Sequence, residues 1–289
     1  MTVLNGIIHL WFNTTWKSTG KIPVLFLFGG MLLKVIKADL GDNKEVQILA
    51  LADWHNGDKR SDGKKIMQHL DYLRTTPNAY AILNGDLMNT AIRTSLSDVY
   101  SETLSPMDQI QHCVKLFDGL QDKIIAINPG NHELRVWKND GLDMTLVMAK
   151  QLGIAEKYSP ESSLVFVSFG KWASHRHSEK VTYSIYCVHG DGGGRTEGAK
   201  VNRLMQLAAI CDADIYIHSH THTPAIVKQQ FYRVHAGNKS VRLVDKLFVN
   251  TGATLEYGGY AELKSFKPAS TDTPIILLDG TRRRMSATL

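Results

Sequence analysis

Cysteine is scarce in this sequence, and long apolar runs are missing. The 289 residues include three cysteines, which form neither a Cys-x-x-Cys pair nor a zinc-ribbon spacing. This excludes a zinc ribbon and a disulfide scaffold, and it predicts a reduced, cytoplasmic setting. The most apolar stretch, residues 22–33, is shorter than the about 20 residues that a membrane-spanning helix needs. We therefore predict no association with a membrane.

Charge of one sign does not dominate either. The chain has 33 Lys and Arg against 28 Asp and Glu, which gives a formal net charge of +5. The excess is spread along the chain, apart from a basic run at residues 282–284. It favours the approach of an anionic substrate without identifying a nucleic-acid binder. With 43% hydrophobic and 21% charged residues, the composition is that of a globular protein and excludes a disordered, collagen-like or coiled-coil chain.

Residues 1–38 differ from the rest and are predicted to be an N-terminal extension, followed by one domain at residues 39–289. Three interpretations of the extension stay open. Its apolar run has the length of a signal-peptide core, although no small-residue cleavage site follows it. Alternatively, the natural chain begins at Met31, or the segment adds a strand or hairpin to the fold.

From residue 45 onward one pattern recurs: a short β-branched, apolar run ends in a polar cluster. Such runs are typical of buried strands, and they lie at residues 46–51, 79–83, 124–127, 183–188, 215–217 and 247–249. Helical periodicity separates several of them, at residues 64–74, 106–120, 142–152 and 199–210. Alternating strands and helices predict an α/β fold of packed layers, whose ligands bind at the carboxyl ends of strands.

The polar clusters offer ligands for metal ions. Five of them follow predicted strands, namely Asp53-Trp54-His55, Asn84-Gly85-Asp86, Gly130-Asn131-His132-Glu133, His189-Gly190-Asp191 and His218-Ser219-His220-Thr221-His222. Each alone is a weak signal, and the alternating histidines are the strongest. Together they supply carboxylate, imidazole and amide donors, which suit Mn, Fe, Zn or Mg. The donors suffice for two ions, which could clamp a phosphoryl group during its displacement.

The order of these clusters resembles that of the calcineurin-like metallophosphoesterase superfamily, over about residues 45–279. The resemblance implies a four-layer α/β/β/α sandwich with mixed sheets. It also implies two divalent ions, with Mn as the first choice and Fe, Zn or Mg as alternatives. In this scheme the metal ligands are Asp53, His55 and His222 for the first ion, Asn131, His189 and His220 for the second, and Asp86 as a bridge.

The resemblance gives two of these residues a part in catalysis. Asp86 would hold both ions, and His132 would bind neither. His132 would instead face the substrate and stabilise or protonate the leaving oxygen. The implied reaction is phosphoester hydrolysis by attack of a metal-bridging hydroxide.

The residues directly after Gly85-Asp86 indicate the branch of the superfamily. The sequence continues Leu87-Met88 and lacks the Asp-Arg-Gly of the protein serine/threonine phosphatases. It is more similar to the nuclease and phosphodiesterase branch, of the kind carried by phages and bacteria. A phosphodiesterase acting on DNA or nucleotide-type esters is therefore the first hypothesis. A phosphomonoesterase for small molecules or phosphoproteins and an inactive metal-containing binding protein are the alternatives, and no oligomeric state is predicted.

Further residues near the clusters are candidates for supporting roles. Arg135 and Arg195 could contact phosphate oxygens, because a planar guanidinium suits them. Asn84, Asn89 and Asp191 could hold the ligands in place by hydrogen bonds. We interpret His218 as a supporting or structural histidine and not as a metal ligand. The polar segments at residues 90–106 and 172–181 are candidate walls of the substrate cleft.

Overall fold

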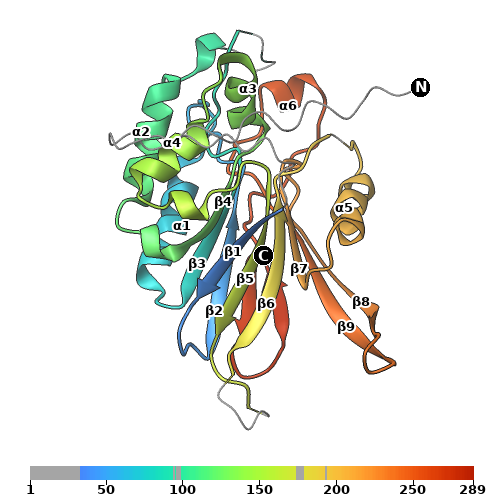
Figure 1. Ribbon diagram of the computed structural model, residues 1–289. Coiled ribbons are helices and arrows are strands. Elements are labelled where there is room, and N and C mark those ends of the chain that lie inside the picture. The colour runs from blue at the N-terminus through green and yellow to red at the C-terminus, as the bar shows by residue number, and fades with distance from the viewer. Residues whose placement is uncertain (1–32, 94, 96–98, 174–178, 193) are drawn as a thin grey trace, which may run out of the picture. The chain divides into compact units, whose positions relative to one another are not determined.

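The computed structural model describes residues 33–93, 95, 99–173, 179–192 and 194–289 (Figure 1). Met31 and nearly all of the apolar run at residues 22–33 therefore lie outside the described residues. Among the described residues, no helix combines the length and the apolar character that a membrane span requires.

One sheet has five strands in the order β11-β10-β2-β3-β4. The strands β2 (Glu45–Leu51), β3 (Ala79–Asn84) and β4 (Ile124–Asn128) run parallel to one another. At the other side β10 (Ile275–Asp279) pairs antiparallel with β2 and with β11 (Met285–Thr288). The sheet is therefore mixed, and the carboxyl ends of its three parallel strands share one edge.

A second mixed sheet has six strands in the order β1-β5-β6-β7-β9-β8. Three neighbouring strands, β6 (Val181–Val188), β7 (Ile215–His218) and β9 (Ser240–Asn250), are parallel. They are flanked by β1 (Lys34–Asp39), β5 (Ser162–Phe169) and β8 (Ala225–His235). β8 and β9 form a long antiparallel hairpin, whose outer half exposes apolar side chains of Tyr232, Val234, Val241 and Leu243.

The helices cover the outer faces of both sheets. On the five-stranded sheet lie α1 (Gly63–Thr75), α2 (Pro106–Phe117) and α4 (Met144–Gln151), whereas α5 (Glu197–Gln206) lies on the six-stranded sheet (Figure 1). The remaining α-helices are α3 (Asn131–Asp140), directly after β4, and α6 (Tyr260–Leu263). Short 3-10 turns occupy Val99–Ser101, Gln121–Lys123, Ala155–Lys157 and Leu207–Ala209.

The alternating side chains of β2 explain how the layers form. Val46, Ile48 and Ala50 point into the core between the two sheets, because successive residues of a strand face opposite sides. Leu49 and Leu51 point into the core beneath the helices. A third core lies under α5. The predicted α/β/β/α sandwich with mixed sheets is thus confirmed.

Two predicted segments adjoin strands of the six-stranded sheet. The boundary between residues 38 and 39 falls inside β1, which pairs with β5, and the assignment of residues 1–38 to an extension stays a prediction. The segment at residues 172–181 joins β5 to the start of β6, whereas the polar cluster follows the end of β6. The eight residues of β6, about 25 Å of strand, separate the described end of this segment at Val181 from that cluster, and its assignment as a cleft wall stays a prediction.

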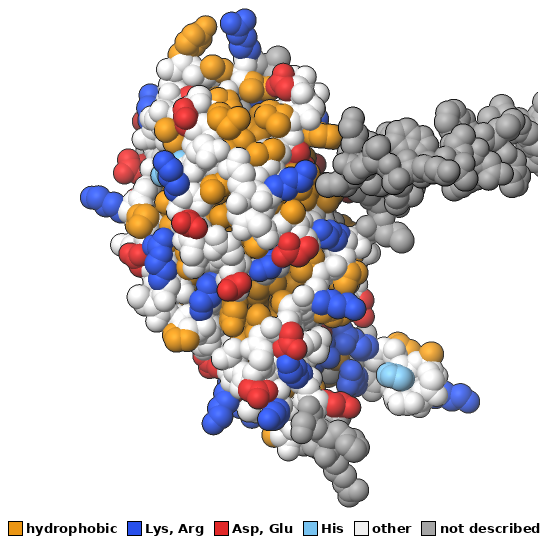
Figure 2. Space-filling model, turned by 60° about the vertical axis from the view of Figure 1, so that its left-hand side comes forward, with side chains coloured by type: hydrophobic (Ala, Val, Ile, Leu, Met, Phe, Trp, Pro, Cys, Tyr) orange, Lys and Arg blue, Asp and Glu red, His pale blue; other side chains and the backbone are white. Residues whose placement is uncertain are grey.

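Charged side chains are dispersed on the face seen in Figure 2, with Lys and Arg scattered among Asp and Glu. This agrees with the spread of charge along the sequence. The same view shows the β8–β9 hairpin as an arm that stands away from the sandwich.

Candidate metal centre

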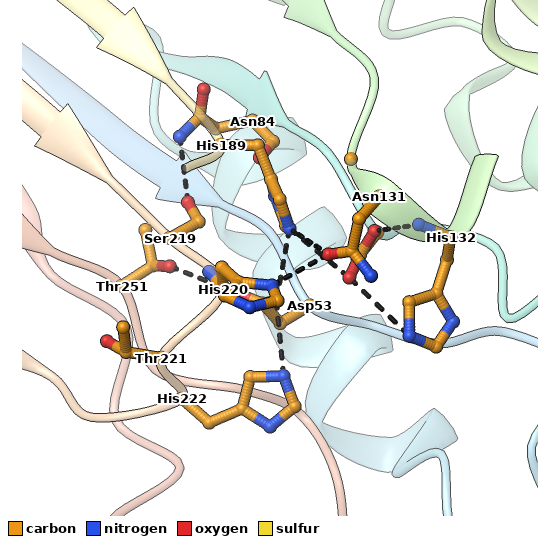
Figure 3. A network of polar contacts seen from close by, with 12 residues as sticks. Asp53, Asn84, Asn131, His132, His189, Ser219, His220, Thr221, His222 and Thr251 are labelled. Atoms are coloured by element: carbon orange, nitrogen blue, oxygen red, sulfur yellow. Dashed lines mark hydrogen bonds and ion pairs between the residues drawn. The ribbon is translucent and has the colours of Figure 1, made fainter. Parts of the chain in front are cut away.

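Five strand ends in two different sheets deliver the predicted ligands to one place. Asp53 and His55 follow β2, Asp86 follows β3, Asn131 begins α3 just after β4, His189 follows β6, and His220 and His222 follow β7. Figure 3 shows the side chains of Asp53, Asn131, His189, His220 and His222 turned toward one another around a common centre. The structure therefore brings together all seven residues that the sequence analysis singled out as ligands.

The first group consists of Asp53, His55 and His222, whose potential ligand atoms all lie within 4.8 Å of one another. Nε2 of His222 lies 3.3 Å from Oδ1 of Asp53. Nε2 of His55 lies 3.2 Å from Nε2 of His222, so the two rings point their outer nitrogens at the same spot. Such an approach suits nitrogens that share a cation, because two lone pairs alone would repel.

The second group consists of Asp86, His189 and His220, within the same 4.8 Å limit. Nε2 of His189 lies 3.2 Å from Oδ2 of Asp86. Oδ1 of Asn131 lies 3.1 Å from Nε2 of His189 and 2.7 Å from Nδ1 of His220, so this amide oxygen points into the group. Nε2 of His55 lies 4.0 Å from Oδ2 of Asp86, which puts the two groups side by side.

The backbone around the ligands adopts an unusual conformation. Five of the seven residues have positive φ angles, namely Asp53 (54°), His55 (46°), Asp86 (51°), His220 (66°) and His222 (51°). Non-glycine residues seldom occupy this left-handed region, and such strain concentrates at functional sites. The surrounding hydrogen bonds hold it in place. Asp53 N donates to Gly85 O at 3.0 Å, and His55 N donates to Asp86 O at 2.9 Å.

Burial and neighbouring charges shape the protonation of the cluster. Burial acts to raise the pKa of Asp86, but His189 and His132 outweigh it and hold this pKa well below its usual range. Burial acts to lower the pKa of His189, yet the Asp86 carboxylate raises it to about 10. Burial, followed by the charge of His189, lowers the pKa of His220 to about 4. At neutral pH Asp86 is therefore ionised and His220 is neutral, which are the forms that bind cations, whereas His189 holds a proton that cation binding would release.

Glu133 lies in one of the five polar clusters, and the sequence analysis predicts no role for it. Its buried carboxylate accepts hydrogen bonds from the main-chain N–H groups of Asp86 (3.0 Å), Met88 (2.9 Å) and Gly130 (2.8 Å). Burial, followed by the charge of Asp86, raises the pKa of Glu133 to about 7. This side chain therefore joins the loop after β3 to the loop after β4. Glu133 is the third residue of α3, and this position is the sequence feature from which its role could have been predicted.

Other polar groups fix the ligands from outside. Asn84 Nδ2 donates to Ser219 Oγ at 2.8 Å, and the Asn84 main-chain oxygen lies 2.7 Å from Nδ1 of His189. Thr251 Oγ1 donates to Asp53 Oδ2 at 3.2 Å. His218 turns away from the ligand groups, with Nδ1 2.8 Å from Oδ1 of Asn250. Asn250 ends β9 and Thr251 follows it. Neither was predicted as a supporting residue, because no charged cluster follows them in the sequence.

His132 lies at the side of the cluster and is partly exposed, at 16% of its side chain. Its Nδ1 lies 2.8 Å from the main-chain oxygen of Asn89, which makes Nδ1 the protonated nitrogen of the neutral ring. Nε2 then faces the cluster, 3.8 Å from Oδ2 of Asp86. Burial lowers the pKa of His132, against the opposing effect of Asp86.

The candidate substrate contacts have different surroundings. Arg135, on α3, is half-buried and interacts electrostatically with Asp86 and Glu133. Arg195 is exposed in the turn before α5, where no hydrogen bond or ion pair links it to the described ligands. Asp191 is also exposed, and its Oδ1 lies 3.2 Å from Arg203 of α5. Arg135 thus interacts with the cluster, whereas Asp191 forms an ion pair with a residue of α5.

The residues present fit divalent cations. Oδ1 of Asp53 is buried and accepts no hydrogen bond from the described residues, although three histidine nitrogens surround it at 3.3–4.0 Å. A buried carboxylate oxygen without a donor is costly unless a cation takes that place. The donors are carboxylate, imidazole and amide oxygen, the set that suits Mn, Fe, Zn or Mg.

A four-layer α/β/β/α sandwich whose strand ends gather aspartate and histidine around one centre defines the metallophosphoesterase class. The model of the calcineurin-like phosphoesterase family matches residues 46–224, and the chain belongs to this family. That stretch contains all seven candidate ligands. Among curated proteins, none matches the chain.

Several solved structures also match the chain at low identity. A predicted phosphoesterase from Streptococcus pneumoniae TIGR4 is 14% identical, with 84% of this chain and 88% of that chain covered and a TM-score of 0.35. Vps29 complexed with zinc, from Entamoeba histolytica, is 16% identical, with 84% and 97% covered and a TM-score of 0.33. GAP50 of Plasmodium is 9% identical, with 85% and 84% covered and a TM-score of 0.41.

Proposed function

We propose that the protein is a two-metal phosphodiesterase that hydrolyses nucleic acid or nucleotide-type esters. The observation that carries the proposal is the pair of adjoining ligand groups, Asp53–His55–His222 and Asp86–His189–His220. Membership of the calcineurin-like phosphoesterase family supports phosphoester hydrolysis as the reaction. Asp86 is the proposed bridge, because its carboxylate lies within 4.0 Å of histidines from both groups.

Two divalent cations, when bound, supply Lewis-acid chemistry and a water molecule of lowered pKa. The protein's own contribution is to fix the ligands before the substrate arrives. Asn131 is held between His189 and His220, and Asp53 is held by the hydroxyl of Thr251. Such preorganisation avoids rearrangement during the reaction and accounts for much of enzymatic rate enhancement.

His132 is the proposed proton donor to the leaving oxygen. The hydrogen bond to Asn89 commits Nδ1, so Nε2 is the atom that carries the transferred proton. Burial lowers the pKa of His132, which makes its imidazolium a stronger acid toward a leaving alkoxide. The same shift reduces the protonated fraction at neutral pH, so this contribution falls as the pH rises.

The preference for a diester rests on the sequence after Gly85-Asp86, which lacks the Asp-Arg-Gly of the serine/threonine phosphatases. Arg135 is the proposed contact to a phosphate oxygen, since it lies beside the cluster one helical turn after His132. Arg195, in the turn before α5, is a second candidate for such a contact. Manganese is the proposed physiological metal, with iron, zinc or magnesium as alternatives that share its preference for these donors.

Elemental analysis combined with a substrate panel tests the proposal. The full chain is assayed with bis-p-nitrophenyl phosphate, p-nitrophenyl phosphate and single-stranded DNA, each with Mn²⁺, Mg²⁺ or no added metal. The expected result is about two bound ions per chain and metal-dependent cleavage of the diester and of DNA. The His132→Ala protein, prepared in parallel, controls for contaminating hydrolases.

The other outcomes separate the remaining hypotheses. Cleavage of the monoester alone would assign a phosphomonoesterase and overturn the preference for nucleic acid. Bound metal without hydrolysis of any substrate would assign a metal-containing binding protein. Absence of bound metal under all conditions would overturn the two-metal centre itself.

A further inference from the structure

Glu102 lies between the 3-10 turn at Val99–Ser101 and α2, outside every motif of the sequence. Its half-buried carboxylate accepts a hydrogen bond from Nδ2 of Asn89 through one oxygen. Through the other oxygen it accepts a hydrogen bond from Nε2 of Gln109 at 2.6 Å. Both donors are buried. The carboxylate is therefore held on two sides.

Asn89 connects this carboxylate to two histidines of the candidate metal centre. Its side-chain oxygen lies 3.3 Å from Nδ1 of His55, and its main-chain oxygen lies 2.8 Å from Nδ1 of His132. An asparagine amide has one accepting oxygen and one donating nitrogen. Because a carboxylate can only accept, Glu102 requires the amide nitrogen to face it. The amide oxygen must then face His55.

This orientation decides which ring nitrogen of His55 carries the proton. Nδ1 must donate to the Asn89 oxygen, and Nε2 is left with its lone pair. Nε2 is the atom that lies 4.0 Å from both Asp53 and Asp86 and 3.2 Å from Nε2 of His222. Reversal of the Asn89 amide would favour the opposite tautomer, in which a proton on Nε2 blocks cation binding.

Tight packing prevents Glu102 from swinging away. The Gln109 side chain is held at its other end too, because its Oε1 accepts a hydrogen bond from Thr90 N at 2.9 Å. A Cβ atom at Gly57 would lie 2.4 Å from Gln109 and 2.9 Å from Glu102, so only glycine leaves room for this pair. The loop after His55 is thus built around the Glu102 carboxylate.

We propose that Glu102 is a positioning residue that, through the amide of Asn89, fixes His55 in the tautomer with a free Nε2. The inference rests on the proposed function only in taking His55 as a metal ligand. The tautomer itself is a property of the chain and can be measured in the absence of metal.

Nuclear magnetic resonance of the full chain labelled with ¹⁵N-histidine tests the proposal. Long-range ¹H–¹⁵N correlation distinguishes protonated from unprotonated ring nitrogens, and a His55→Gln sample identifies the His55 signals. In the metal-free wild type we expect a proton on Nδ1 and none on Nε2. In Glu102→Ala we expect a mixture of tautomers or a predominant proton on Nε2.

Titration with Mn²⁺ by calorimetry gives the second measurement. We expect Glu102→Ala to weaken binding of at least one cation by about 10–100-fold, the usual effect of losing such an outer hydrogen bond. Glu102→Gln keeps one accepting oxygen for the two donors Asn89 and Gln109, so both measurements should fall between those of Glu102→Ala and the wild type. Ser105→Ala, which removes the hydroxyl that accepts from Asp108 N at the start of α2, is the control for local loosening.

The outcomes are distinguishable. If Glu102→Ala keeps the wild-type tautomer, or changes it no more than Ser105→Ala does, the proposal is wrong. If the wild type carries its proton on Nε2, the proposal is equally wrong. A wild type that binds no cation but shows the expected tautomers would contradict the proposed function and leave the positioning by Glu102 intact.

Discussion

Gly130 and Asp86 approach each other so closely that a side chain at position 130 would collide with the carboxylate. A Cβ atom there would lie 2.0 Å from Oδ1 of Asp86. The φ angle of Gly130 is −102°, so backbone strain is not the reason for glycine. The contact instead locates the proposed bridging carboxylate against the loop after β4.

We therefore expect Gly130→Ala to displace Asp86 and to lower divalent-metal content and hydrolysis about tenfold or more. Gly198→Ala is the matched control, because a Cβ atom at that helical position meets nothing within 4 Å. It should keep metal and activity and gain about 0.5–1 kcal/mol of stability. Metal analysis, assay and urea unfolding of both variants check this. Equal metal content in the two would contradict the proposed position of Asp86.

His132→Ala should lower turnover while leaving metal content intact. Nε2 of His132 faces the cluster but is proposed to act on the leaving oxygen, a role typically worth 10²–10⁴-fold. Asp86→Ala is the contrasting variant and should lose at least one ion. Steady-state kinetics and elemental analysis of the purified proteins separate the two roles. Full phosphodiesterase turnover in His132→Ala would rule out His132 as the proton donor to the leaving oxygen.

Glu133→Ala should destabilise the folded protein. The three main-chain N–H groups that donate to Glu133 would lose their acceptor inside the protein, and each such loss costs about 1–3 kcal/mol. We expect the free energy of unfolding to fall by about 3 kcal/mol or more. Glu133→Gln keeps one accepting oxygen, so its free energy of unfolding should lie between those of Glu133→Ala and the wild type. Urea unfolding of metal-free wild type and both variants measures these differences. An unchanged urea midpoint in Glu133→Ala would show that Glu133 does not stabilise the fold.

His69 makes stability depend on pH, away from the metal centre. This buried residue of α1 has its Nε2 2.9 Å from Thr273 Oγ1, and its Nδ1 has no hydrogen-bond partner among the described residues. Burial, followed by the charge of Lys65, lowers the pKa of His69 to about 4. The unfolded chain, with an ordinary pKa near 6.5, binds the proton more readily. The stabilising effect is thus complete above about pH 6.5 and is lost as the pH falls toward 4.

We expect metal-free wild type to lose up to about 1.4 kcal/mol more per pH unit than His69→Gln across this window. Unfolding by urea at pH 7, 6 and 5, with chelator present, measures the difference. His235→Gln, on the exposed hairpin, is the control and should follow the wild type. If the stability of wild type and of His69→Gln changed with pH in parallel, the buried His69 ring would not contribute to the pH dependence of stability.

Much of the fold followed from local pattern. The predicted runs match β2, β3, β4, β6, β7 and the end of β9, because these strands are buried and read as continuous apolar sequence. β5 was not predicted from the same pattern. Its alternating sequence ends at Gly170 and Lys171 with no cluster of ligand type. β8 was missed because polar side chains interrupt it, as its mostly exposed position allows.

The residues of the candidate site likewise divide into those that the sequence predicted and those that it did not. Residues such as Asp53 and His222 could be found because each lies in a polar cluster that follows a buried strand, where a parallel sheet gathers its ligands. Glu102 could not, since it lies 13 residues from Asn89 in irregular chain and its role depends on tertiary contacts. No helix was predicted at Asn131, although this residue begins α3 and is positioned by that helix.

The strands that carry the ligands belong to two sheets, joined by an apolar interface and closed at one edge by Asp53, Asp86 and their histidines. A cation held there would bind the folded chain and have no comparable site once the sheets separate. Metal supply would then govern how long the protein survives, because chelation lowers the temperature of denaturation and increases the fraction of molecules open to proteolysis.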